Sequence, residues 1–257
     1  MRSRLMTLIV VGVFALAIAP KLSGARVQDN RFGDELRERD EMNQTYELAP
    51  GASIEVSGIN GPVEIDTASS TTAVVHIIRS ANTQEDLAHH RILVDRSSSS
   101  LVVHGEEDHS RAKVRQHVML TVPRAASLKV SGINGRVKAG EFEGPATISG
   151  INGRVEVGQA IGYSTITGIN GAISITLARL GERGLHMSGI NGSIDLKFAD
   201  ELNADLEVSS INGQVYTELP NVTMQGKWSP TNFHARIGSG GAPITISGVN
   251  GRIKLGK

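Results

Sequence analysis

The sequence predicts an all-β fold, a single-chain β-solenoid with coils of 18 to 21 residues. A five-residue phrase, Ser/Thr-x-Ile/Val-Asn-Gly, recurs along the chain, and its copies begin at Ser57, Ser131, Ser149, Thr167, Ser188, Ser209 and Ser247. Such a period is typical of stacked-repeat proteins. Apolar and polar residues alternate on both sides of the phrase, which indicates strands. Glycine is frequent (29 residues) and aromatic residues are few (4%), so small aliphatic side chains must build the core.

The first 25 residues have the pattern of a secretory signal peptide. Two arginines precede the apolar run Leu5–Ala19, and the small residues Ser23 to Ala25 form a cleavage site. Cleavage after Ala19 is an alternative. A second alternative is retention as a membrane anchor, although a spanning helix needs about 20 apolar residues. We therefore expect an exported protein that contacts a membrane only through an uncleaved leader.

Residues 26–46 are dense in charge and poor in apolar side chains, so we expect a flexible linker before a folded domain at 47–257. The long interval between the first two phrases predicts an antiparallel lobe at about 71–122, inserted after the first coil. This lobe should contain a short helix whose first turn is capped by Thr83. A second long interval, before the last phrase, predicts an excursion at about 219–240.

The Asn-Gly dipeptide within each phrase is also a strong hairpin signal. In a two-residue hairpin, Ile133 would share a polar face with Arg136, although an Ile or Val precedes Asn-Gly in every phrase. A coil corner that bends at Gly132 returns Ile133 to the interior and brings the asparagines of successive coils together. We therefore favour the solenoid over a meander or sandwich. The predicted corner residues are Asn60, Asn134, Asn152, Asn170, Asn191, Asn212 and Asn250.

The composition excludes several classes of function. Basic and acidic residues balance at 26 each, which leaves no overall field to attract nucleic acid, and we expect no such partner. The chain has no cysteine, so packing and backbone pairing must hold it together without disulfides. No nucleophile elbow or phosphate-binding loop is recognisable. We therefore expect no enzymatic activity, no catalytic residues and no cofactor.

Two acidic residues are the weak counter-argument to a non-enzymatic function. Glu156 and Asp195 occupy outward positions two coils apart, with Ser174 between them. Carbohydrate-active β-helix enzymes, both polysaccharide lyases and hydrolases, need acids clustered on such a face. A solvated surface is the explanation that we favour.

Aromatic and histidine residues provide the remaining candidate sites. Tyr216, Trp228 and Phe233, near the late excursion, form a candidate sugar-stacking or ligand surface, although packing explains them equally well. His104 and His109 are the weak candidates for metal ligation, but the segment reads as a flexible loop without a fixed ligand set. We therefore expect no metal site.

The pattern resembles a known family of exported bacterial proteins, the "putative adhesin" domain of unknown function. The resemblance rests on the leader, on Leu120-Thr121-Val122-Pro123 before the regular coils, on the repeated phrases, and on Gly238-Ser239-Gly240-Gly241 before the last phrase. It implies a β-solenoid in the periplasm or on the cell surface of a bacterium, without known catalytic residues. We expect an adhesin or envelope scaffold that binds a protein or glycan partner, with end-to-end or edge self-association as a further option.

Overall fold

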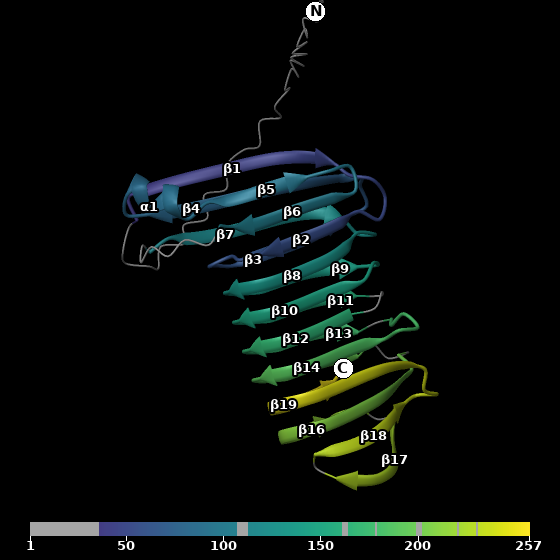
Figure 1. The fold of residues 1–257 in the computed structure, drawn as a ribbon. Helices are drawn as coiled ribbons and strands as arrows, with labels where there is room; N and C mark the ends of the chain where they lie inside the picture. Colours follow the sequence, from purple (N-terminus) through teal and green to yellow (C-terminus); the bar gives the residue numbers. More distant parts are fainter. Residues whose placement is uncertain are drawn as a thin grey trace, which may run out of the picture. The chain divides into compact units, whose positions relative to one another are not determined.

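The computed structural model describes residues 36–106, 113–160, 164–177, 179–198, 202–219, 221–229 and 231–257, with the side chains at 159–160, 210 and 226–228 outside this description. The described residues belong to one unit, Leu36–Lys257. It is all-β with one short helix, and its hydrogen bonds join a 19-stranded sheet (Figure 1). The predicted all-β class is therefore confirmed.

Strands on the N-terminal side of the Asn-Gly dipeptides pair in one parallel column, which we call the first ladder. In spatial order it contains β2 (Ser53–Ser57), β8 (Ser127–Asn134), β10 (Ala146–Asn152), β12 (Ser164–Asn170), β14 (Leu185–Asn191) and the first parts of β19 (Ala242–Gly256) and β16 (Ala204–Thr217).

Strands that follow the Asn-Gly dipeptides pair in a second parallel column, the second ladder. It contains β3 (Val63–Ala68), β9 (Val137–Phe142), β11 (Val155–Ala160), β13 (Ile173–Leu177), β15 (Ile194–Phe198) and the second parts of β19 and β16. Both ladders follow the same order. Each repeat therefore contributes one strand to each ladder, with its phrase at the junction.

The isoleucine before each Asn-Gly lies inside. Ile133, Ile151, Ile169, Ile190 and Val249 are adjacent across the first ladder, and each is only 1% exposed. The inward residues of both ladders belong to one continuous hydrophobic cluster. Burial contributes about 0.8 kcal/mol per CH₂ group, so this cluster supplies most of the stabilisation. The hairpin alternative, which would place Ile133 on a polar face, is therefore wrong.

The two glycines of a phrase serve different purposes. Gly132 has φ +63°, a left-handed conformation that bends the chain before Ile133 returns to the core. At Gly153, the last residue of its phrase, a Cβ atom would lie 2.1 Å from the carbonyl oxygen of Gly135 in the adjacent repeat. The first glycine thus makes the bend, and the second allows the backbones of neighbouring corners to approach closely.

Part of the predicted linker at 26–46 is a β-strand, so that prediction was wrong for these residues. Residues 38–46 were expected to be flexible, but they belong to β1 (Glu38–Glu47), which pairs antiparallel with β4 (Thr72–Ala81) along its full length. Met42 and Tyr46 on β1 pack against the core. Backbone pairing and these two side chains order the strand despite its charge, because charged neighbours on a strand can point to solvent.

The predicted lobe at 71–122 is only partly antiparallel. β4 and β5 (Ile92–Arg96) do pair antiparallel, with β7 (Arg115–Pro123) and β6 (Ser100–Gly105) respectively. However, β6 extends the first ladder by pairing parallel with β2, and β7 extends the second by pairing parallel with β3. The lobe therefore adds a strand pair on the outer side of β2 and β3. Its alternating buried residues, such as Leu101 and Val103, join the same core.

The short helix predicted in this lobe is confirmed as α1 (Gln84–His89). The Thr83 side chain caps it by accepting a hydrogen bond of 3.1 Å from the backbone nitrogen of Asp86. No helix in the described part of the chain is long and apolar enough to cross a membrane.

The C-terminal end has a changed chain order. β19, the last strand, lies between β14 and β15 on one side and β16 on the other. The excursion at 219–240 contains the antiparallel strands β17 (Val222–Ser229) and β18 (Asn232–Ile237), and β18 pairs with the first part of β16 (Figure 1). The first ladder thus continues for two strands beyond β16. Among the described residues, no strand continues the second ladder there.

Candidate functional site

The corner asparagines form one column of side-chain hydrogen bonds. Each side-chain amide nitrogen donates to the side-chain oxygen of a neighbour: Asn134 to Asn60 (3.1 Å), Asn152 to Asn134 (3.1 Å), Asn170 to Asn152 (3.2 Å), Asn191 to Asn170 (3.3 Å), Asn250 to Asn191 (3.2 Å) and Asn212 to Asn250 (3.3 Å). The interior amides thus use both their oxygen and their nitrogen within the column. This arrangement holds the corners in register and leaves them less able to recognise a ligand.

Gln116 on β7, which the sequence analysis overlooked, lies at the N-terminal end of this column. Its side chain is buried, and its Oε1 accepts a hydrogen bond of 2.8 Å from the backbone nitrogen of Asn60. A buried polar side chain on an otherwise apolar strand face was the available signal. Buried amides need such partners, and here the partner is the first corner.

The outward face of the second ladder carries a shallow groove of about 610 Å³. Strand register aligns Lys138, Glu156, Ser174 and Asp195 on neighbouring strands across it. Two residues without side chains, Gly140 and Gly158, are among the lining residues. The groove therefore presents one cationic, two anionic and one hydroxyl side chain on parallel strands about 4.8 Å apart.

The two acids in this groove lie on strands that are separated by a third strand. Oε1 of Glu156 lies 3.5 Å from Nη2 of Arg136 and 3.6 Å from Nη1 of Arg154. Asp195 is two strands away, roughly 10 Å at the spacing of parallel strands. Retaining glycosidases hold their carboxyl groups about 5–5.5 Å apart, and inverting ones about 6.5–9.5 Å. The strand spacing between Glu156 and Asp195 is close to the upper limit of these ranges, and Glu156 lies within ion-pairing distance of two arginines.

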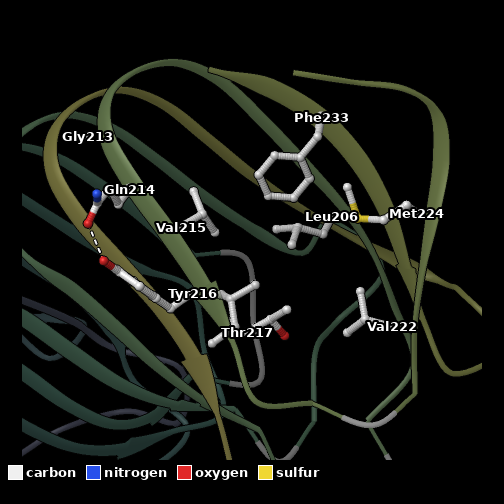
Figure 2. A pocket seen from close by; sticks show the side chains of 10 residues that line it. Leu206, Gly213, Gln214, Val215, Tyr216, Thr217, Val222, Met224 and Phe233 are labelled. Atoms are coloured by element: carbon white, nitrogen blue, oxygen red, sulfur yellow. Dashed lines mark hydrogen bonds between the residues drawn. The ribbon is translucent and has the colours of Figure 1, made fainter. Parts of the chain in front are cut away.

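A second cavity lies at the C-terminal end, between β16 and the β17–β18 hairpin. It encloses about 340 Å³, and its lining is mainly apolar (Figure 2): Leu206, Gly213, Gln214, Val215, Tyr216, Thr217, Val222, Met224, Phe233 and Leu255. Figure 2 shows Val215, Leu206, Phe233, Met224 and Val222 around the same space, and Tyr216 at its edge beside Gln214. This cavity continues the hydrophobic core of the stack to the surface.

Two of the three residues predicted as a ligand surface line this cavity. Tyr216 is exposed, with its hydroxyl group donating to Oε1 of Gln214 and its ring 5.7 Å from the guanidinium carbon of Arg252. Phe233 is buried among the lining residues, and the side chain of Trp228 lies outside the described residues. Met224, which the sequence analysis missed, is 43% exposed on the opposite side. Its alternation with Val222 was the available signal.

Of the two histidine candidates, the structure describes only His104. His104 is half-buried on β6, with Nδ1 3.7 Å from an Asp95 oxygen. His109 lies outside the described residues. Within the described ranges, no group of three His, Cys, Asp or Glu side chains is placed to hold a metal ion.

The carboxyl group of Glu41 on β1 has a shifted pKa and lies away from both cavities. The pKa of Glu41 on β1 is below its usual range, chiefly because the His76 side chain hydrogen-bonds to it. His76 Nε2 and Glu41 Oε1 are 2.7 Å apart. Arg39 adds electrostatic attraction. This interaction links β1 to β4 and makes no contact with the groove.

No family model matches the chain, and neither does any curated protein. Solved structures do resemble it. A putative cell adhesion protein from Clostridium sporogenes is 8% identical, with a TM-score of 0.42 over 84% of this chain and 99% of that one. A putative adhesin from Bacteroides fragilis is 11% identical (TM-score 0.29; 84% and 97% covered). A putative lipid binding protein from Parabacteroides distasonis is 9% identical (TM-score 0.29; 85% and 97% covered).

Proteins described as adhesins thus stand among the structural neighbours, as the resemblance noted in the sequence implies. Their identities to this chain are low. The function proposed below therefore rests on the geometry of the chain itself.

Proposed function

We propose that the protein is an exported, non-enzymatic β-solenoid, an adhesin or scaffold of the bacterial envelope that binds a protein or glycan partner through the groove on the second ladder. In this proposal the two ladders are the two faces of each solenoid coil. The observation that carries it is the in-register row of Lys138, Glu156, Ser174 and Asp195 across four parallel strands.

Rigid presentation of side chains favours binding. Each strand of the groove is hydrogen-bonded on both edges to other strands, so the outward groups keep fixed spacings before a partner arrives. Preorganised groups lose less conformational entropy on binding. Repeated strands also create an extended surface on which a long partner makes several equivalent contacts. The mixture of cations, anions and hydroxyl groups suits the hydroxyl-rich surface of a glycan or the polar rim of a protein interface.

Export is proposed from the leader-like residues 1–25, with the bacterial periplasm or the cell surface as the location. The body from Leu36 to Lys257 then acts as the binding domain. Its stability in such a compartment rests on the core and on strand pairing, because the sequence contains no cysteine.

A matched pair of variants tests the groove. Ser174→Lys places a long cation at the centre of the groove, whereas Thr165→Lys places the same group on the outward face of the first ladder, in the same repeat. Both positions are half-exposed. We expect wild-type protein and Thr165→Lys to bind envelope material, and Ser174→Lys to lose at least tenfold in affinity. Binding is measured by co-sedimentation with purified peptidoglycan and lipopolysaccharide, and by cross-linking to solubilised envelope proteins.

Two outcomes would contradict the proposal. Equal binding by Ser174→Lys and Thr165→Lys would show that the groove is not the binding surface. Turnover of a polysaccharide by the wild-type protein that Glu156→Gln abolishes would instead establish a carbohydrate-active enzyme.

A further inference from the structure

The two ends of the second ladder differ in their protection against added strands. At one end the outermost strand is β1, in which five of ten residues are charged. At the other end the outermost segment is Gly213–Thr217 of β16, which contains no charged residue. Proteins commonly protect exposed strand edges with charge. β1 has this protection, and the β16 edge lacks it.

The unprotected edge has free hydrogen-bonding capacity. Residues 213–217 pair with Gly251–Leu255 of β19 on one side, and no strand of the described chain pairs with their other side. Along this edge lies the apolar cavity, with Val215 and Thr217 among its lining residues. Tyr216 and Met224 flank the cavity, and their side chains are 46% and 43% exposed. An added strand would therefore gain both backbone pairing and an apolar site.

The β17–β18 hairpin determines what kind of chain fits. Beyond β16 the first ladder continues with β18 and β17, whereas the second ladder has no counterpart to either strand among the described residues. A second folded copy that continued the stack would bring strands for both ladders, and those of its first ladder would collide with the hairpin. A single extended segment meets no such obstacle.

We propose that the Gly213–Thr217 edge accepts an extended peptide segment of a partner protein as an added β-strand. The segment is uncharged, as are the edge and all ten residues that line the cavity. It carries apolar side chains at alternate positions, since alternate residues of a strand point to one face and would enter the cavity against Phe233, Val222 and Met224. In this mode of recognition, backbone hydrogen bonds give affinity and the pocket gives specificity. It is independent of the groove on the second ladder.

Hydrogen exchange tests the proposal with a defined probe. The probe is the end-blocked peptide Thr-Val-Thr-Val-Thr-Val-Thr, added to the full protein. We expect it to slow amide exchange in segment 214–217 at least tenfold. Met224→Lys should weaken binding at least tenfold by placing a charge in the apolar cavity. Thr223→Lys, the neighbouring exposed position outside the lining, should bind as the wild type does. The groove variant Ser174→Lys should also bind normally, which separates this site from the proposed function.

Three results would overturn the proposal. The first is unchanged exchange in 214–217 at millimolar peptide. The second is protection of segment 214–217 from exchange in the peptide-free protein, if this protection strengthens as the protein concentration rises. That result would assign the edge to contact with a second copy. The third is binding of lauric acid in the cavity with no effect of the peptide, which would assign the cavity to an acyl chain. A peptide with N-methyl groups at alternate residues is the control for backbone pairing and should not bind.

Discussion

The last glycine of a phrase is the position at which the corner tolerates an added side chain least. Gly153 and Gly171 approach the adjacent corner so closely that an added Cβ atom would lie 2.1 Å and 1.9 Å, respectively, from a carbonyl oxygen. Neither contact involves a flexible side chain. Relief of the clash therefore requires that the backbones of two repeats separate, which also weakens the strand pairing beside the corner.

We predict that Gly153→Ala is much more destabilising than Gly51→Ala. Gly51 also has positive φ (+74°), but no atom lies within 4 Å of its added Cβ. Gly51→Ala should lower the free energy of unfolding only by the cost of placing alanine in a left-handed conformation, about 1–2 kcal/mol. Gly153→Ala adds steric overlap, and we expect a total loss of about 3 kcal/mol or more. Urea denaturation measures both variants. Equal losses would show that the corners are not in close contact.

A second prediction concerns the asparagine column. Asn152 donates to Asn134 and accepts from Asn170, whereas Asn212, at the end, only donates to Asn250. A net intramolecular hydrogen bond contributes about 1 kcal/mol. Asn152→Ala should therefore lower the free energy of unfolding by about 2 kcal/mol, and Asn212→Ala by about half as much. Chemical denaturation provides the comparison, and an equal or larger loss at Asn212 would argue against a continuous column.

At the scale of single residues, the sequence predicted the burial of a side chain wherever strand register allowed only one face for it. Ile133 had to lie inside because a hairpin would leave it on a polar face, and it is 1% exposed. The tight contact at Gly153 could not be inferred, because it depends on how closely two corners approach. Met224 was overlooked because its alternation with Val222 does not by itself show that the second ladder ends at β16, which leaves Met224 beside an open cavity.

Among the elements, β1 and β19 show what pattern alone misses. β1 has only Met42 and Tyr46 as apolar contacts, and its order comes from pairing with β4, a partner about thirty residues later in the chain. β19 has the regular repeat pattern, but its place between β14 and β16 reverses the chain order. A period predicts that strands stack, and it does not say which strand follows which.

The position of β19 leads to a prediction about truncation. Deletion of residues 242–257 removes the strand that joins β16 to β14 and β15. We expect β16 and the β17–β18 hairpin to lose protection from amide exchange, whereas β8 and β10 keep theirs, because each repeat contacts only its neighbours. Removal of Lys257 alone, a position outside β19, should change neither region. Retained protection of β16 after the longer deletion would contradict the strand order.

For the whole molecule, the two ends are the part that a repeat pattern predicts least well. The chain starts its regular stack at β2 and β3, but β6 and β7 later extend the same ladders outward. The β17–β18 hairpin ends only one ladder, and this unequal ending creates both the apolar cavity and the free edge. Residues 71–122 and 219–240 were recognised as insertions. The first was predicted to be antiparallel throughout, but β6 and β7 also pair parallel with β2 and β3. The pattern could not show this, because antiparallel and parallel partners place similar demands on an alternating strand.

The central claim is that successive repeats advance by one strand spacing along each ladder. Outward positions of the second ladder provide a scale, since strand register orders them as Glu64, Lys138, Glu156, Ser174, Asp195, Lys254 and Tyr216. The chain has no cysteine, so spin labels attach only at cysteines introduced for the purpose.

Pulsed electron-spin distance measurements between pairs of labelled positions test this claim most directly. At about 4.8 Å per strand, labels at 138 and 254 should lie roughly 19 Å apart, and labels at 64 and 216 roughly 29 Å apart, allowing for the length of the labels. Labels at 64 and 254 should give an intermediate distance. A distance that grows with the number of intervening strands is the predicted result. A 64–216 distance no longer than the 138–254 distance would contradict the stack.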